Sequence, residues 1–465
     1  MPVSPMKELQ VSRFSARVVD HKRRQIILIP PKLNRKIRRK LNMRGKLVML
    51  LVCMGILWGI KEPVGAAVFY VWVTLFRPLD FAFAPLPSLA PIAFALLVVS
   101  IGIASARGIV KLKWNIACSY LLAIICVAFL SACIAPIQER AWEKFTEVWK
   151  IILPSILISM IISTEREYRA VIITFAGSIG IWAIQAAIHG AMSGGAAESM
   201  SIGGQMSDRN DFAVGVLMTW PIFYYLGLNE KRKLIKKGIQ GATFLTCLCV
   251  IVSNSRGAML GLFATLFMNI TRKGTKRIKN LVTTVVLLPL MIPLIPQYAI
   301  DRLNTINFSG GEQKEASANA RTVLMKSGLT GSLDRPFFGF GPGCWPIHAH
   351  KYIPGGAMGD GAVEPHCVWI KISTELGFVG LGVYLLMFWR ITANLKKIQK
   401  RCLRIGRKDY YNYAYMLQLS IMGFCLGASL INQSFYEYMF LVIAVSGAFI
   451  RSWKVYMESA EEADK

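Results

Sequence analysis

The chain has 465 residues, of which 54% are hydrophobic and only 17% charged, and its mean hydropathy is +0.45. Soluble domains carry about 25% charged residues, so this composition excludes an ordinary soluble protein. Apolar runs of roughly 15 to 23 residues recur, and about 20 residues suffice to span a bilayer. The sequence therefore predicts an all-α, polytopic integral membrane protein rather than a transmembrane β-barrel, whose strands alternate over about 10 residues.

The formal net charge of +28 raises nucleic-acid binding as an alternative. However, Lys and Arg cluster in short loops between apolar runs, as the positive-inside rule requires. No aromatic-basic recognition module is present. The basic tail at residues 1–44 is expected to lie against anionic cytoplasmic lipid. We therefore expect membrane lipid, and no nucleic acid, as a partner.

Apolar runs follow this tail and divide the chain into five parts. These parts are the cytoplasmic tail at 1–44, transmembrane helices at 45–296, a large external loop at 297–365, further transmembrane helices at 366–452 and a second cytoplasmic tail at 453–465. The apolar runs are 46–60, 63–76, 89–106, 114–135, 148–163, 171–189, 212–228, 239–252, 258–269, 281–295, 367–389, 414–432 and 436–450.

Three basic loops predict the orientation of these helices, because such loops face the cytoplasm. The turn at 253–257, the loop at 192–209 and the large loop then face outside. These orientations agree only if the runs 46–60 and 63–76 make one net crossing that is broken at Pro63, which leads to about twelve crossings. The basic loops contain Lys231, Arg232, Lys233, Lys236 and Lys237; Arg272, Lys273, Lys276, Arg277 and Lys279; and Lys396, Lys397, Lys400, Arg401, Arg404, Arg407 and Lys408.

The large loop ends in Glu364-Pro365-His366 and continues into the apolar run 367–389. His366 is therefore expected to open a helix at the boundary between water and membrane. The positive end of a helix dipole disfavours an imidazolium, so His366 should be neutral and able to act as a general base. A histidine that only caps or anchors the helix is an alternative that the sequence leaves open.

Two arginines are candidates for binding an anion. Arg256 lies in the external turn between two apolar runs, where an arginine is costly and usually has a partner. Its planar fork suits bidentate binding of a phosphate ligand. An Asp or Glu side chain of the protein is the alternative partner for this arginine. Arg321 lies in a helix-like stretch of the large loop and by itself carries little information. The other loop candidates are expected to be structural or solvated: Arg302, Arg335, His348, His350 and Lys351.

Other polar features have simpler interpretations. The glycines at 339, 341 and 343 lack the context of a nucleotide-binding loop and predict a tight turn. Asp211 precedes an apolar run and is interpreted as a helix cap. Cys344 and Cys367 both fall on the external side, where a disulfide between them is possible. No cysteine or histidine spacing predicts a metal site.

Short motifs in the second half of the chain together resemble the bacterial O-antigen ligase and polymerase superfamily, nearest its branch of putative O-glycosylation ligases. The resemblance covers roughly residues 207–386, and it rests on the order of the motifs along one external face. The motifs are SDRNDF at 207–212, SNSRGA at 253–258, RLNTI at 302–306, ANAR at 318–321, RPFFGFG at 335–341, PHCVW at 365–369 and TELGFVGL at 374–381.

The resemblance implies a GT-C-like membrane glycosyltransferase in the bacterial inner membrane. It would transfer a glycan from an undecaprenyl-pyrophosphate carrier to a glycan, lipid or protein acceptor at the periplasmic face, with inversion and without metal, nucleotide or other cofactor. By the same resemblance, His366 matches the catalytic histidine, and Arg256 and Arg321 match the pyrophosphate-binding arginines. Cys367 and Arg209 depart from the usual motifs, which leaves the acceptor open.

Two other classes of function are weighed against this one. A secondary transporter or lipid-linked sugar flippase would favour inverted repeats and short loops. The sequence has no internal repeat, and one loop dominates it. A structural partner in a secretion complex is a third possibility. Only the transferase needs to form a covalent bond, so glycan transfer by purified protein discriminates among the three.

Overall fold

The computed structural model describes residues 35–82, 88–192, 202–253, 255–272, 312–353 and 364–463. Every regular element in these ranges is a helix, which confirms the all-α fold class. The helices are α2 (Arg35–Lys61), α3 (Pro63–Phe76), α4 (Pro78–Ala82), α5 (Ala90–Ala106), α6 (Ile116–Cys133), α7 (Gln138–Ile161), α8 (Glu165–Met192), η2 (Gly204–Met206), α9 (Arg209–Asn229), α10 (Lys233–Val252), α11 (Arg256–Ile270), α14 (Glu312–Asp334), α15 (Trp345–His348), η4 (Ala349–Tyr352), α16 (Val368–Arg404), α17 (Lys408–Gly427), η5 (Ala428–Leu430) and α18 (Glu437–Ala463).

Seven helices in the described part of the chain are long and apolar enough to cross a membrane. Three shorter apolar helices, α3, α5 and α11, accompany them. This composition agrees with a polytopic integral membrane protein. The predicted run at 281–295, Asn254 and Arg302 lie outside the described residues, so the number of about twelve crossings stays a prediction.

The first two predicted runs form a helical hairpin. α2 and α3 pack against each other, and a Cβ added to Gly55 would collide with the ring of Phe69. Glu62 between them is extended, with φ −139° and ψ 132°, and Pro63 starts α3, where its missing N–H costs nothing. The break lies where the sequence predicts it, but the chain turns back there. How the two runs cross the membrane stays a prediction.

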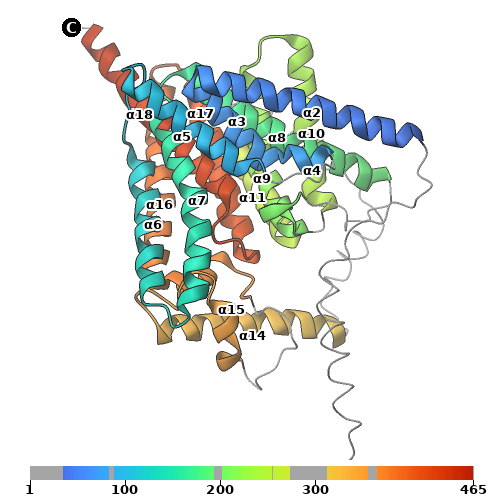
Figure 1. Cartoon of the computed structure of the whole chain (residues 1–465), viewed down its shortest axis with the longest axis vertical. Helices are drawn as coiled ribbons and strands as arrows, with labels where there is room; N and C mark the ends of the chain where they lie inside the picture. Colours follow the sequence, from blue (N-terminus) through green and yellow to red (C-terminus); the bar gives the residue numbers. More distant parts are fainter. Residues whose placement is uncertain are drawn as a thin grey trace, which may run out of the picture.

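The large loop and the basic segment 396–408 lie at opposite ends of the molecule. Figure 1 shows α6, α7 and α16 along one flank, with α14 lying across their lower ends. α18 runs to the opposite end, where the C-terminus projects and α2 also lies. We call the end covered by α14 and α15 the loop end. The basic segment 396–408 contains the end of α16 and the start of α17, and it lies away from the loop end. The two sides of a membrane would require this separation.

α16 is interrupted at Gly377, whose φ of 69° and ψ of −175° are not helical. The segment 336–341 of the large loop fits into this break, and the N–H of Phe340 donates to the carbonyl of Thr374 at 2.8 Å. A Cβ at Gly377 would collide with the carbonyl of Phe337, so the position requires glycine. The RPFFGFG and TELGFVGL motifs therefore form one interlocked unit that fixes the loop on the membrane helices.

The tight turn predicted from the glycine cluster is confirmed. Gly339, Gly341 and Gly343 have φ values of 68°, 103° and 70°, which favour glycine. The turn carries Phe340 and Cys344 into a small hydrophobic core against the end of α6 and the start of α7. This core is the second point at which the loop is attached to the helices.

Several side chains of the large loop have structural roles. The His348 ring stacks on Phe340 with 4.8 Å between centroids, and the Arg335 guanidinium lies 5.3 Å from the same ring. Burial and the nearby charge of Arg335 lower the pKa of His348. Cys344 and Cys367 are both buried and free, so the disulfide that the sequence allows is not formed.

Arg272 differs from the solvated loop residue that its basic surroundings suggest. Its side chain is 5% exposed, and its guanidinium lies over the rings of Tyr225, Tyr411 and Tyr415 at 4.9, 4.4 and 5.2 Å. It also donates to the side-chain oxygen of Asn412. A desolvated guanidinium over an aromatic ring contributes about 2 kcal/mol. This contact joins α9 and α17 to the chain just after α11, at the end away from the large loop.

Candidate functional site

His366 lies just before α16 and is half-buried. Its φ of 48° is in the left-handed region, which costs a non-glycine residue of order 1–3 kcal/mol unless surrounding contacts hold it. One such contact is with Asn432, whose amide nitrogen lies 3.1 Å from Nδ1 of His366. The expectation that His366 opens the helix is wrong, because Cys367 caps α16 and Val368 is its first residue.

The pKa of the His366 imidazole is lowered, chiefly by burial and then by the positive charge of Arg321. Lys371 adds to this effect, whereas Glu364 and Asp208 oppose it. The direction is the one the sequence predicts, and burial and neighbouring cations account for it. The imidazole is therefore neutral at neutral pH, which is the form that can accept a proton.

α14 brings Arg321 to His366. α14 packs across the start of α16, where the hydroxyls of Ser332 and Ser373 are hydrogen-bonded at 2.8 Å. Arg321 is exposed on α14, and its charge acts on the imidazole of His366. The structure therefore places these two candidates in one electrostatic neighbourhood.

Arg256 is the exposed first residue of α11. α11 runs antiparallel to α17: a Cβ at Gly261 would lie 3.7 Å from the backbone nitrogen of Gly427, and the Tyr415 hydroxyl donates to the carbonyl of Met268 at 2.5 Å. The start of α11 therefore lies beside the end of α17 and the adjoining η5.

η5 in turn contacts the start of α16. The indole N–H of Trp369 donates to the hydroxyl of Ser429 at 3.0 Å. Arg256 and His366 thus flank the same short element at the loop end. Among the described residues, however, no contact joins Arg256 to His366 or to Arg321. The structure brings His366 and Arg321 together and leaves Arg256 at the edge of the site.

The start of α9 faces the same region. Asp208 caps α9, because its carboxylate accepts from the N–H of Asn210 at 2.7 Å, so the cap predicted at Asp211 is wrong. Asp211 is only 6% exposed and accepts from the amide of Gln433 at 3.1 Å, while its carbonyl accepts from the Tyr436 hydroxyl at 2.9 Å. A buried carboxylate needs such partners, and these ones tie α9 to the segment before α18.

Further charges lie at the start of α16 and just before it. Nζ of Lys371 is 2.8 Å from Oε1 of Glu364, and their side chains are only 13% and 21% exposed. Glu375, one turn after Lys371, is 1% exposed, and the described residues supply no hydrogen-bond partner to its carboxylate oxygens. Charged side chains within spanning helices are costly and mark functional sites. The charges of Lys371 and Glu364 act on both Asp211 and His366, so these side chains belong to one polar region.

The segment 431–436, between η5 and α18, is fixed by hydrogen bonds from two directions. The Tyr384 hydroxyl donates to the carbonyl of Ser434 at 3.1 Å. The amide of Gln205 donates to the carbonyl of Phe435 at 2.8 Å. These contacts come from α16 and η2, so the position of Asn432 is set by elements on both sides of the segment.

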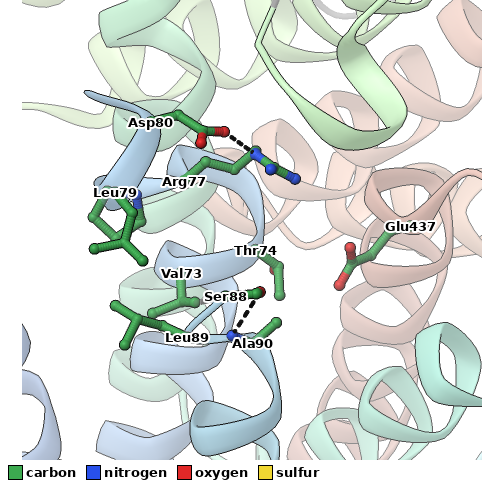
Figure 2. A pocket seen from close by; sticks show the side chains of 10 residues that line it. Val73, Thr74, Arg77, Leu79, Asp80, Ser88, Leu89, Ala90 and Glu437 are labelled. Atoms are coloured by element: carbon green, nitrogen blue, oxygen red, sulfur yellow. Dashed lines mark hydrogen bonds and ion pairs between the residues drawn. The ribbon is translucent and has the colours of Figure 1, made fainter. Parts of the chain in front are cut away.

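A polar cavity of about 190 Å³ lies at the start of α18 and is lined in part by Arg77, Asp80 and Glu437. Figure 2 shows Glu437 facing it from α18, with the Arg77–Asp80 ion pair on the opposite wall. Glu437 also accepts from the Tyr70 hydroxyl at 2.9 Å. His366 does not line this cavity. Glu437 therefore anchors the start of α18, and with it the segment that carries Asn432.

Four polar residues at this site were not predicted from the sequence: Asn432, Gln433, Lys371 and Glu375. A usable signal was present for each. Asn432 ends one apolar run, Gln433 follows it before the next run begins, and Lys371 and Glu375 are charges inside a third run. Ionisable residues within a predicted membrane span are functional candidates by default.

The arrangement can accept a proton at His366 and present positive charge from Arg321 to an anionic ligand. Both abilities suit the transfer of a group away from a phosphate. Among the described residues, no group of three His, Cys, Asp or Glu side chains is placed to hold a metal ion. The expectation of a reaction without metal is not tested by this and stays a prediction.

Two family models match the chain. Residues 241–385 match the family described as O-antigen ligase, and residues 43–216 match a family of unknown function (DUF5935). No curated protein matches the chain. The first match contains Arg256, Arg321 and His366, the second contains Asp211, and Asn432 lies beyond both. The chain thus carries an O-antigen ligase domain, which confirms the resemblance to the O-antigen ligase and polymerase superfamily that the order of its motifs predicts.

Proposed function

We propose that the protein is a glycosyltransferase of the O-antigen ligase type. It transfers a glycan from an undecaprenyl-pyrophosphate carrier to an acceptor hydroxyl at the periplasmic face of the bacterial inner membrane. The observation that carries the proposal is the half-buried imidazole of His366, held by Asn432 and facing the charge of Arg321. A lipid-linked donor suits this place, because its prenyl chain can stay among the helices while its pyrophosphate reaches the loop end.

In the proposed step, the acceptor hydroxyl oxygen forms a bond to the anomeric carbon of the glycan. The bond between that carbon and the pyrophosphate oxygen breaks, and its electron pair leaves with undecaprenyl pyrophosphate. Nε2 of His366 takes the hydroxyl proton. Arg256 and Arg321 stabilise the negative charge that develops on the leaving group. Attack opposite the leaving group inverts the anomeric configuration.

Asn432 decides which nitrogen of His366 is free for this role. With the Asn432 amide nitrogen against Nδ1, the neutral ring carries its proton on Nε2. A half-turn of the amide instead sets Oδ1 against an Nδ1–H and leaves the lone pair of Nε2 free. Oδ1 of Asn432 is buried without a partner among the described residues, and the half-turn gives it one. We therefore assign Asn432 the role of holding the tautomer in the working enzyme.

A transfer assay with purified protein tests the proposed function. The protein in detergent receives undecaprenyl-pyrophosphate-linked glycan and one acceptor at a time: lipid A core, a growing glycan chain or an acceptor protein. One acceptor should become glycosylated, and free undecaprenyl pyrophosphate should appear in equal amount. A transporter or lipid-linked sugar flippase moves its substrate without making a bond. Movement of the donor across a reconstituted bilayer, with no transfer to any acceptor, would establish that alternative.

Asn432→Asp should keep activity at alkaline pH but move the acid limb of the pH profile upward by about 1 unit or more. The new carboxylate still accepts Nδ1–H, but its charge favours the imidazolium. The pKa of His366 therefore rises, and the base becomes protonated at pH values where the wild-type imidazole is neutral. The measurement is kcat/KM against pH. The other charges that face His366 stay in place: Arg321, Glu364, Asp208 and Lys371.

Asn229→Asp is the matched control for Asn432→Asp. Asn229 ends α9 away from the large loop, where its side-chain oxygen accepts from the amide of Asn412 at 2.6 Å. The substitution adds the same charge far from His366, so the acid limb should not move. If wild type and Asn432→Asp have equal pH profiles, Asn432 does not hold the tautomer of His366 in the working enzyme.

A further inference from the structure

A groove of about 700 Å³ lies between the start of α6 and the C-terminal parts of α16 and α18. Figure 1 places this part of α18 at the end of the molecule opposite α14. The groove therefore lies far from His366, at the end that carries the basic segment 396–408. The proposed glycan transfer makes no use of it.

Four cations line the groove, and none of the described residues that line it is Asp or Glu. Lys397 and Arg401 are four residues apart on α16, so they share one face of that helix. Arg451 and Lys454 come from α18. Lys454 pairs with Glu458 at 3.7 Å, but their side chains are 79% and 59% exposed, and such pairs contribute little.

One of these cations is built into the wall of the groove. The Arg451 guanidinium is half-buried and donates to the carbonyl of Ser159 at 3.2 Å, and also to those of Lys113 and Ile162. These carbonyls are neutral acceptors, so they fix the guanidinium without cancelling its charge. Lys397, by contrast, is exposed and can move to meet a ligand.

Most of the remaining wall is apolar and includes Trp114, Ile116, Ile450 and Met457, while Asn115 and Asn394 add uncharged polar groups. Trp114 is 51% exposed, and its indole N–H is hydrogen-bonded to Ser119 at 2.8 Å. Tryptophans with a polar tip and an apolar ring are typical of the membrane boundary. The groove thus offers both positive charge and an apolar surface. A free anion would use only the positive charge, whereas a lipid would use both.

We propose that this groove binds an anionic phospholipid. Its phosphate would lie between Lys397, Arg401 and Lys454, and the first part of its acyl chains would lie against Trp114 and Ile450. Basic pockets between spanning helices at the cytoplasmic side hold anionic headgroups in this way. The chain's own basic tail at 1–44 has the wrong charge to fill the groove. The proposal is independent of the proposed glycan transfer.

Native mass spectrometry of the full-length protein in mild detergent tests the proposal. The protein is titrated with phosphatidylglycerol or, separately, with zwitterionic phosphatidylethanolamine. The double variant Lys397→Gln/Arg401→Gln should bind phosphatidylglycerol at least about tenfold more weakly than wild type, since each basic residue near an anionic lipid contributes a factor of about five. Binding of phosphatidylethanolamine should be weak and equal in both proteins.

Lys396→Gln/Lys400→Gln is the matched control. It removes the same charge one residue earlier on α16, and neither residue lines the groove. Phosphatidylglycerol binding should then stay near the wild-type value. An equal loss in both double variants would show general surface attraction and overturn the proposal. So would inorganic phosphate that binds the delipidated protein with the same dependence on Lys397 and Arg401, because the ligand would then be a free anion.

A charge-conserving variant guards against misfolding. Lys397→Arg/Arg401→Lys keeps both charges and should retain phosphatidylglycerol. If Lys397→Gln/Arg401→Gln melts at a lower temperature than wild type, this variant decides the question: retained lipid supports the proposal, and lost lipid overturns it.

Discussion

His366→Gln is expected to lower the turnover of glycan transfer by about 10²- to 10⁴-fold, the usual cost of losing a general base. Glutamine can donate a hydrogen bond at this position, but it cannot accept and carry away the proton of the acceptor hydroxyl. Binding of the lipid-linked donor should survive, because Arg256 and Arg321 are proposed to hold its pyrophosphate. Turnover and donor affinity are measured separately on purified protein with a defined donor.

The pH profile of the wild-type enzyme supplies an independent check. Burial and the charge of Arg321 lower the pKa of His366, so the neutral base persists below its ordinary pKa of about 6.5. Activity should be full above that value and fall as the pH drops through the lowered pKa. A profile that stays flat through this region would contradict a histidine base.

His350→Gln is the control for this substitution. His350 is exposed on η4 in the same loop, outside the proposed machinery, and its replacement should leave turnover unchanged. A turnover for His366→Gln within about threefold of wild type is far short of the loss expected for a base. That result would leave His366 as a residue that shapes the entry into α16.

Arg256→Lys is expected to lower kcat/KM by about 10²-fold or more, with normal insertion into the membrane. Lysine keeps the charge but loses the planar fork that binds two phosphate oxygens at once. Because the fork would act on a leaving group whose charge grows during the reaction, kcat should fall more than the affinity for the donor. Steady-state kinetics with varied donor concentration separate the two parameters.

Arg232→Lys provides the comparison for Arg256→Lys. Arg232 precedes α10 at the end away from Arg256, is exposed, and contacts Glu230 at 3.3 Å. Its replacement tests the general effect of an arginine-to-lysine change on this protein and should be neutral. Equal kinetics for Arg256→Lys and wild type would mean that the fork is not needed, and that Arg256 is a boundary residue of α11.

Sequence alone determined the class of protein and the place to look for chemistry. Run length and hydropathy are local properties, so the apolar helices could be predicted wherever the structure describes them. The charge between runs is local too, and the basic segment 396–408 does lie at the end opposite the large loop. His366 could be singled out because it stands where a long polar loop meets an apolar run. Arg256 was found by the same kind of argument.

The tertiary structure decided which side chains share the site. Asn432 is 66 residues from His366, and Gln433 is 222 residues from Asp211, so no local pattern could pair them. The prediction that Asp211 caps a helix was wrong, because the packing of α9 buries its side chain against the segment before α18. Contacts between distant segments depend on how whole helices pack, and hydropathy along the chain does not encode that packing. The same reason explains why Pro63 predicted a break but not the hairpin that α2 and α3 form there.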